Sequence, residues 1–524
     1  MNMTRFGDLL QTQAVLSALS RGGEGSNLVC LGNFAPATDL LCGLGSVHPV
    51  EGAKWLAALD REWKEALGGL WSWLEKSSSC AEGERLINLT PSLAARLLSR
   101  LLGQEGVDGF SVDGYGFGSS STPWATFLQV SSTRRGSSPF NMVDLLWRVA
   151  RLGSEPRPYQ LASPSSGVQD AARDMLAAAA PPECSGFVAF QLGASSTDRC
   201  WPEEYFALLG GLVWEKFSLC PVLLGAASER GLSQGYADAS RAPYVDLVGE
   251  TNLVELSGVL QHMQALVSND TGTMHLAAGL DIPVLALFLA TAQPWDTGPF
   301  SAGNLCLEPD LDCHPCDFSS SCEHDHRCRR AISPQTVFTC LEALLNPDGQ
   351  PALDMVSARV WRTAHDHLGF HDLVSLSGHE TCDRTQWIRL QRVLYRDFLD
   401  RQTLDASRLP VPRLSIPAFE GIVSALDHGR QLLGLLGEQL KVLERSPLPA
   451  FKSKVLATVQ QVQQLWEHSE HLGVLGLLWQ QQTQQSSRDL GEFRGLVERY
   501  RELCRTALEA LTMDRNRDGA ARNL

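Results

Sequence analysis

The chain has 524 residues, which is too long for one hydrophobic core and predicts about three domains at roughly 150 residues each. Hydrophobic residues make up 44% and charged residues 20%, as in an ordinary soluble globular protein. The formal charge of −15 argues against broad nucleic-acid binding, which needs a basic surface, but it leaves room for a local basic site. We find no secretory signal and no apolar run of about 18 residues, so we expect a cytoplasmic protein without a transmembrane segment.

The first half of the sequence alternates predicted helices and strands. Helices are expected at 9–19, 55–74, 92–102 and 142–151, and strands at 27–31 and 86–89. A short strand at 2–5 precedes the first helix. Such alternation predicts a mostly parallel sheet. Residues 112–139 are rich in Gly, Ser and Thr and are interpreted as loops that could grip an acceptor.

The second half restarts the same pattern after a predicted linker at 153–186. Strands are expected at 187–190, 221–224, 245–247, 265–267 and 283–288, with helices at 202–214, 253–260 and 274–280. We therefore expect two α/β domains, 1–160 and 187–345, that face each other across a cleft at the carboxyl ends of their strands.

Residues 350–524 have a different character and predict an all-α C-terminal domain. A seam from Phe419 to Leu443 has apolar residues spaced 3-4-3-4-3-4-3, and two further stripes begin at Val455 and Leu490. These stripes either bury one another in a bundle within one chain or leave a surface for self-association or for a partner protein.

The run Ser268-Asn269-Asp270-Thr271-Gly272-Thr273 joins an apolar strand to an apolar helix. The unpaired N–H groups at the start of that helix fall on Thr271, Gly272 and Thr273, where they and the helix dipole favour a phosphate. The alternative is that Asp270 or Thr271 merely caps the helix.

Four segments together resemble glycosyltransferase family 9, the ADP-heptose:lipopolysaccharide heptosyltransferases and their relatives. They are the stretch 266–288 around Asp270, Phe6-Gly7-Asp8-Leu9-Leu10, the pair Gln191 to Ser195 and Trp201 to Glu204, and a cysteine cluster from Cys313 to Cys328. The resemblance spans roughly residues 1–340. It implies a GT-B fold of two Rossmann-like domains and inverting transfer of a sugar from a nucleotide donor.

The resemblance assigns the general base to Asp8, which would take the proton from the acceptor hydroxyl. Asp8 follows Gly7 where a strand gives way to a helix, and the positive end of that helix favours its ionised form. The alternative is that Asp8 only caps the helix at 9–19.

The donor would be held by residues of the second half. Arg199 stands where the family usually has a Lys that neutralises the diphosphate, although it could also be a surface charge. Asp270 would bind hydroxyls of the donor sugar. His275 is either a phosphate donor or a core histidine, and we favour the latter. The full candidate set is Gly193, Ser195, Ser196, Thr197, Arg199, Asp270, Thr271, Gly272, Thr273 and His275.

The thiols of Cys313, Cys316, Cys322 and Cys328 lie within sixteen residues, a spacing that suits a tetrahedral metal site. Zinc or iron would fit as a structural ion, and the alternative is a group of free thiols. No cofactor is expected for the chemistry itself.

The resulting hypothesis is a glycosyltransferase that uses a heptose donor, expected to be ADP-heptose, to extend lipopolysaccharide core or a related glycan, lipid or protein acceptor. A peripheral position at the inner membrane stays open. The family's Phe-Gly-Pro-Thr is Phe288-Leu289-Ala290-Thr291 here. That change supports the alternative, a degenerate GT-B scaffold that acts through its helical domain.

Overall fold

The computed structural model describes residues 1–22, 25–78, 84–103, 106–133, 138–153, 159–318, 321–346, 353, 357–486 and 489–521. The chain divides into two compact units. Unit 1 comprises Met1–Ser121 and Phe140–Gly378, and unit 2 comprises Thr122–Pro139 and His379–Leu524. The expected boundary near residue 350 lies outside the described residues.

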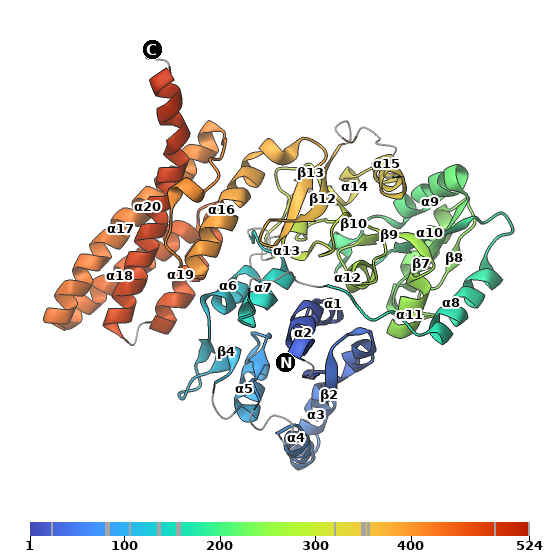
Figure 1. The fold of residues 1–524 in the computed structure, drawn as a ribbon, viewed down its shortest axis with the longest axis horizontal. Coiled ribbons are helices and arrows are strands. Elements are labelled where there is room, and N and C mark those ends of the chain that lie inside the picture. Colours follow the sequence, from blue (N-terminus) through green and yellow to red (C-terminus); the bar gives the residue numbers. More distant parts are fainter. Residues whose placement is uncertain are drawn as a thin grey trace. The chain divides into compact units, whose positions relative to one another are not determined.

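An eight-stranded sheet forms the centre of unit 1, in the order β13-β12-β11-β10-β9-β6-β7-β8 (Figure 1). The six strands from β11 to β8 run parallel, as the alternating pattern predicted, and β12 and β13 add an antiparallel edge. Their bounds are β6 Gly186–Gln191, β7 Leu219–Leu224, β8 Val245–Asp246, β9 Met263–Asn269, β10 Val284–Leu287, β11 Leu305–Pro309, β12 Ala358–His365 and β13 His371–Ser375.

Helices pack on this sheet and close its core. Apolar side chains from β6, β7, β9, β10 and β11 meet those of α9 and α15 in one buried cluster that contains Phe190, Trp201 and Phe206. The helices are α8 Ser166–Ala179, α9 Glu203–Phe217, α10 Arg230–Ala239, α11 Leu253–Leu260, α12 Gly272–Gly279, α13 Pro294–Thr297, α14 Cys328–Ala331 and α15 Pro334–Leu345. The loops at the strand ends therefore extend from a rigid scaffold, the closely packed sheet and its helices.

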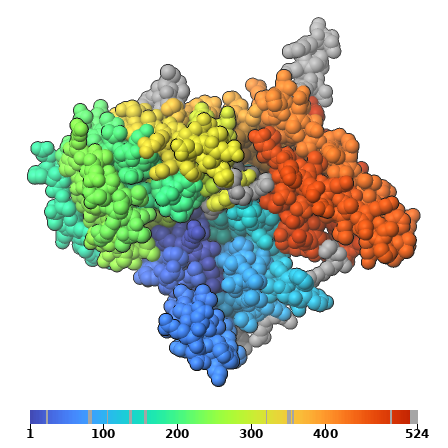
Figure 2. Space-filling view, turned by 180° about the vertical axis from the view of Figure 1, so that it is seen from behind, coloured from blue at the N-terminus to red at the C-terminus, as the bar shows by residue number. Residues whose placement is uncertain are grey.

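The first 121 residues form smaller sheets. Strands β1 Ser26–Leu31 and β2 Leu44–Val50 pair in parallel, and β3 Ile87–Asn88, β4 Asp108–Val112 and β5 Gly118–Ser120 make a second sheet. The helices are α1 Phe6–Leu10, α2 Gln13–Leu19, α3 Gly52–Leu59, α4 Trp63–Ser78 and α5 Leu93–Leu102, and α7 Met142–Val149 follows later. The α3–α4 pair projects from the rest of unit 1 in both views (Figures 1 and 2).

Three predicted elements differ at the start of the chain. Residues 2–5 are not a strand, although Asn2 N–H donates to Val29 and Leu89 N–H donates to Met1, so the segment still lies between β1 and β3. The helices expected at 9–19 and 55–74 are each two helices, because a turn at 11–12 separates α1 from α2 and a turn at 60–62 separates α3 from α4.

Unit 2 is helical and contains α6 Pro123–Ser131, α16 Asp383–Leu399, α17 Ile416–Arg445, α18 Pro449–Glu467, α19 Gly473–Ser486 and α20 Leu490–Ala521. Two features correct the expected domain at 350–524. The strands β12 and β13 belong to the sheet of unit 1, and α6, from the stretch expected to be loops, belongs with the helices. Strand β12 pairs with the sequence-distant β11, from Leu305 opposite Arg362 to Pro309 opposite Ala358, and no local pattern predicts this pairing.

The heptad seam of α17 is buried inside unit 2. Ile422, Leu426, Leu433, Leu436 and Leu440 are all at or below 1% exposed, and α17 packs on α18 and α20. Trp466 of α18 and Tyr500 of α20 stack at 5.9 Å between ring centroids. The seam is therefore used within one chain, as in the intramolecular interpretation. Across the described ranges, no helix has the length and apolar content to cross a membrane.

Candidate active site

The loop after β9 is held in place by one buried amide. Asn269, fully buried at the end of β9, accepts a hydrogen bond at Oδ1 from the Trp201 N–H (2.9 Å). Its Nδ2 donates to the carbonyls of Leu192 (2.9 Å) and Gly193 (3.2 Å). Asn269 thereby fixes three segments against one another: the ends of β6 and β9 and the Trp-Pro turn before α9. No local sequence signal distinguishes Asn269 for this role.

Helix α12 begins directly after this loop, and its first turn meets helix α1. A Cβ built on Gly7 would lie 3.1 Å from Gly272 Cα, and one built on Gly272 would overlap Phe6 Cδ1. Both glycines are thus required by close approach of the two helices. Thr271 is the N-cap residue, but its side chain makes no capping hydrogen bond; its hydroxyl lies 3.1 Å from that of Ser268. Thr271 is therefore not a side-chain cap, so that alternative is wrong for this residue.

Asp8 lies in the first turn of α1, beside this junction. The helix begins at Phe6 with Arg5 as the N-cap residue, so Asp8 is the third helical residue and not a cap. Its side chain is partly exposed, and its carbonyl accepts a hydrogen bond from Asn2 Nδ2 (3.2 Å). Because Gly7 contacts Gly272, the carboxylate of the next residue is carried on a turn that packs against the start of α12.

Arg199 and Asp270 form a buried ion pair. Arg199 Nη2 lies 3.0 Å from Asp270 Oδ2, and the two side chains are 8% and 7% exposed. Arg199 Nη1 also donates to Ser195 Oγ (2.9 Å), while its Nε has no hydrogen-bond partner among the described residues. The ring of Phe318, from the cysteine loop, lies 6.0 Å from the guanidinium carbon. Arg199 is therefore not a surface charge, and the pair joins two predicted donor residues that are 71 positions apart.

The loop after β6 presents its hydroxyls to solvent. Ser195, Ser196 and Thr197 are exposed, whereas Gly193 is buried against the Glu229 carboxylate. A Cβ on Gly193 would overlap Glu229 Oε1, so this position tolerates no side chain in the present arrangement. Glu229 Oε2 accepts from the Ala226 N–H (2.8 Å) within the loop after β7 and from Gln191 Nε2 (3.4 Å) at the end of β6, so it connects the ends of these two strands.

Two further predicted residues serve the packing of the site. His275 is 5% exposed and lies with its Nε2 2.6 Å from Gln11 Nε2, and the Tyr159 hydroxyl donates to its carbonyl (3.0 Å). This favours the core-histidine interpretation. The Thr273 hydroxyl donates to Gln191 Oε1 (2.9 Å). Gln11 and Gln191 were not predicted as site residues, although Gln191 begins one of the segments that carry the resemblance, because nothing in the sequence indicates what a Gln side chain contacts.

The loop after β10 shows how the chain accommodates its departure from Phe-Gly-Pro-Thr. Leu289 is fully buried in the core of the sheet, and the left-handed backbone conformation falls on Ala290 (φ 52°). This conformation costs a non-glycine residue roughly 1–2 kcal/mol. The Ala290 carbonyl accepts from the Cys316 N–H (2.9 Å), so the loop is attached to the cysteine segment.

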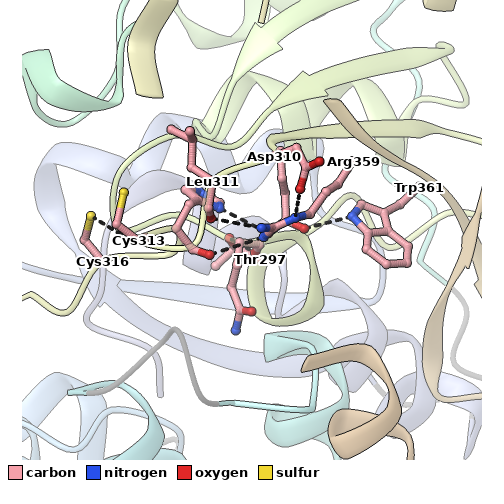
Figure 3. A network of polar contacts seen from close by, with 10 residues as sticks. Thr297, Asp310, Leu311, Cys313, Cys316, Arg359 and Trp361 are labelled. Atoms are coloured by element: carbon pink, nitrogen blue, oxygen red, sulfur yellow. Dashed lines mark hydrogen bonds and ion pairs between the residues drawn. The ribbon is translucent and has the colours of Figure 1, made fainter. Parts of the chain in front are cut away.

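Arg359 of β12 anchors the start of that cysteine segment (Figure 3). Its Nε pairs with Asp310 (3.1 Å), and its Nη2 and Nη1 donate to the carbonyls of Leu311 (2.9 Å) and His314 (3.3 Å). The β12–β13 hairpin, which was not predicted, therefore positions the loop that carries the thiols.

Two of the four cysteines, Cys316 and Cys328, have thiols with a raised pKa. Burial, and then the neighbouring Cys328, Cys313 and Cys322, raise the pKa of Cys316 to about 11. Burial likewise raises the pKa of Cys328. In the part of the chain that the structure describes, no three His, Cys, Asp or Glu side chains are grouped as metal ligands. The donor set suits a soft metal chemically, but the described side chains are not gathered around one point, and the predicted metal stays a prediction.

Comparison with known proteins identifies the protein family. The model of glycosyltransferase family 9 (heptosyltransferase) matches residues 84–326. This segment belongs to glycosyltransferase family 9. The match leaves the helical unit after residue 378 outside the family domain, as expected, and it also starts after Asp8.

The family 9 assignment is supported by similar curated proteins. Lipopolysaccharide heptosyltransferase 1 of Pseudomonas aeruginosa is 27% identical over 361 residues, which cover 65% of this chain and 95% of the relative. Lipooligosaccharide heptosyltransferase 2 of Haemophilus ducreyi is 33% identical over 108 residues, 19% of this chain and 30% of the relative. The chain is thus a heptosyltransferase-like glycosyltransferase.

A solved structure gives the same answer for the fold. The family 9 glycosyltransferase of Veillonella parvula superimposes with a TM-score of 0.52 at 16% identity, covering 66% of this chain and 96% of that chain. At this identity the likeness concerns the fold, an α/β architecture with a mostly parallel sheet.

Proposed function

We propose that the chain transfers a heptose, with inversion, from ADP-heptose to lipopolysaccharide core or a related glycan. The observation that carries the proposal is the convergence of three predicted elements: the Arg199–Asp270 pair, the uncapped start of α12 and the helix that bears Asp8. We further propose that the two α/β halves of unit 1 work as the two lobes of a GT-B enzyme.

In this mechanism the diphosphate binds between the Arg199 guanidinium and the positive end of helix α12. Arg199 would share its guanidinium with phosphate oxygens, and the N–H groups of Thr271, Gly272 and Thr273 would add the field of the helix terminus. The exposed hydroxyls of Ser195, Ser196 and Thr197 can donate further hydrogen bonds. Asp270 would accept hydrogen bonds from hydroxyls of the sugar.

The reaction then needs one proton transfer. As the acceptor oxygen attacks the anomeric carbon, the Asp8 carboxylate takes its proton, and the C–O bond to the diphosphate breaks on the opposite face of the sugar. The negative charge that develops on the leaving ADP is stabilised by Arg199 and the α12 terminus. Each of these steps uses side chains and backbone groups of this chain alone.

Nucleotide preference tests the proposal. Calorimetry with ADP, GDP and UDP should show that the purified full-length chain binds ADP more tightly than the other two. Comparable affinities would count against an adenine donor, and the absence of binding by all three would contradict the proposed function. The relatives named above point to lipopolysaccharide as the acceptor; lipid-linked glycans and proteins are the alternatives to test with the same donor.

Replacing Arg199 by Ala should weaken ADP binding about ten- to a hundredfold, because a charge-assisted contact contributes roughly 1.5–3 kcal/mol. The affinity that remains should depend less on salt. Arg230→Ala is the matched control, since Arg230 is an exposed arginine of the same half that pairs with Glu250 (2.6 Å). Equal ADP affinities of the two variants would remove Arg199 from the donor site.

The cysteine loop offers a separate test. Protein prepared without chelator is expected to contain about one equivalent of zinc or iron per chain, and Ser in place of Cys316 and Cys328 should lower the thermal midpoint more than the activity of the folded fraction. Elemental analysis checks the first point. Metal-free protein with unchanged stability would identify the cluster as free thiols.

A further inference from the structure

The Arg199–Asp270 pair balances two charges that have little access to water. Both side chains are more than nine-tenths buried, and Asp270 Oδ2 is 3.0 Å from Arg199 Nη2. Removing one partner of a buried pair leaves the other charge uncompensated, which is strongly unfavourable. Any ligand that draws Arg199 away must therefore also provide a partner for Asp270.

Both terminal nitrogens of the Arg199 guanidinium already have acceptors within the protein. Ser195 and Asp270 engage its two terminal nitrogens, and Nε stays without a partner in the described structure. A diphosphate can compete with the carboxylate for Nη2, whereas Nε is buried and out of a ligand's reach in this arrangement. The diphosphate cannot serve Asp270, because a phosphate and a carboxylate are both anionic acceptors.

A sugar has the complementary chemistry. Its hydroxyls donate hydrogen bonds to a carboxylate and so can replace the guanidinium as partner of Asp270. An intact nucleotide sugar brings both groups, whereas a nucleoside diphosphate brings one. In the complex with the nucleotide sugar, both buried charges have partners. In the complex with the nucleoside diphosphate, Asp270 still competes with the phosphates for Arg199.

We propose that Asp270 is an internal competitor of the diphosphate for Arg199, and that this competition makes the site prefer the intact donor over the ADP left after transfer. The inference rests on the proposed function and extends it to specificity and product release. Once the sugar has moved to the acceptor, Asp270 loses its hydroxyl partners and reclaims Arg199, which weakens the hold on ADP. The Asp270 carboxylate thus lowers the affinity for ADP through Arg199, in addition to binding the hydroxyls of the sugar.

The test compares ADP affinities of charge-neutral variants. Asp270→Asn should bind ADP about tenfold more tightly than the parent, because Arg199 is then left buried without its counter-ion. Affinity for intact ADP-heptose should rise less or fall, so the preference for donor over ADP shrinks. Product inhibition by ADP should strengthen correspondingly. Asp270→Ser, which removes the carboxylate without adding bulk, should change ADP affinity in the same direction and is used if the Asn variant fails to fold.

Asp198→Asn is the matched control. It removes the same charge one residue before Arg199, and Asp198 forms no ion pair with Arg199 among the described residues. ADP affinity within about twofold of the parent is expected for this control. An unchanged or weaker ADP affinity in the Asp270 variants would overturn the inference, as would an equal gain in Asp198→Asn. If the parent protein binds ADP but the Asp270 variants do not bind it more tightly, the inference is wrong and the proposed function stands. If the parent protein binds no ADP, both the proposed function and the inference are contradicted.

Discussion

Replacing Asp8 by Asn is expected to lower the rate of heptosyl transfer by about 10²- to 10⁴-fold, the usual effect of losing a general base. The amide has the shape of the carboxylate but cannot accept the acceptor proton. Asp8 is partly exposed in the first turn of α1 and is not a helix cap, so the change should leave folding intact. Single-turnover kinetics with ADP-heptose would measure the loss.

Donor affinity separates this effect from misfolding. ADP binding by Asp8→Asn should stay close to that of the parent, since the proposed phosphate ligands are on other elements. Asp60→Asn, an exposed carboxylate in the turn after α3, controls for loss of one negative charge. A parental transfer rate in Asp8→Asn would remove this residue from the mechanism.

A chain that ends at Gly378 is expected to be poorly soluble, even though it keeps the whole family 9 segment. Helix α6 precedes the cut, yet it belongs to unit 2, where it packs on α19. Trp124, Phe127 and Leu128 of α6 are buried. Exposing three such side chains would cost roughly 5–9 kcal/mol at about 1.5–3 kcal/mol each, an upper estimate comparable with the stability of a domain.

Complementation provides the control for that truncation. Residues 379–524 supplied as a separate chain should restore solubility, because they bring back the surface that α6 packs on. Light scattering and the soluble fraction after expression are the readouts. A soluble, monomeric chain ending at Gly378 would contradict the assignment of α6 to the helical unit. A cut at residue 347 would be more damaging still, because it would remove β12 and β13 from the sheet.

Local patterns in the sequence predicted the elements whose structure depends mainly on their own residues. Alternating apolar segments predicted the parallel strands β6 to β10 but not β11, and the spacing from Ile422 to Leu443 predicted a buried helical seam. The junction at Asp270 was likewise visible, because a polar run between an apolar strand and an apolar helix is typical of a loop that binds an anion.

Non-local contacts account for what the sequence did not reveal. Strand β12 pairs with β11 about fifty residues earlier, and α6 joins helices more than two hundred residues later. Neither partnership changes the local pattern of apolar residues. The same holds for the site: Asn269 looks like any loop amide until Trp201 and Leu192 are seen to converge on it. The role of Asp8 rests on resemblance, and its place in the helix became clear from the contact of the preceding glycine with α12.

The most direct test of the central claim is transfer itself. Purified full-length chain is incubated with ADP-heptose and lipopolysaccharide core that lacks heptose, and the acceptor is examined by mass spectrometry while released ADP is quantified. We predict that the acceptor gains the mass of one heptosyl residue with one ADP released, and that Asp8→Asn gives neither product at a comparable rate. ADP release without a gain in acceptor mass would indicate a different acceptor, and no release of ADP with any glycan, lipid or protein acceptor would contradict the proposed heptosyltransferase activity.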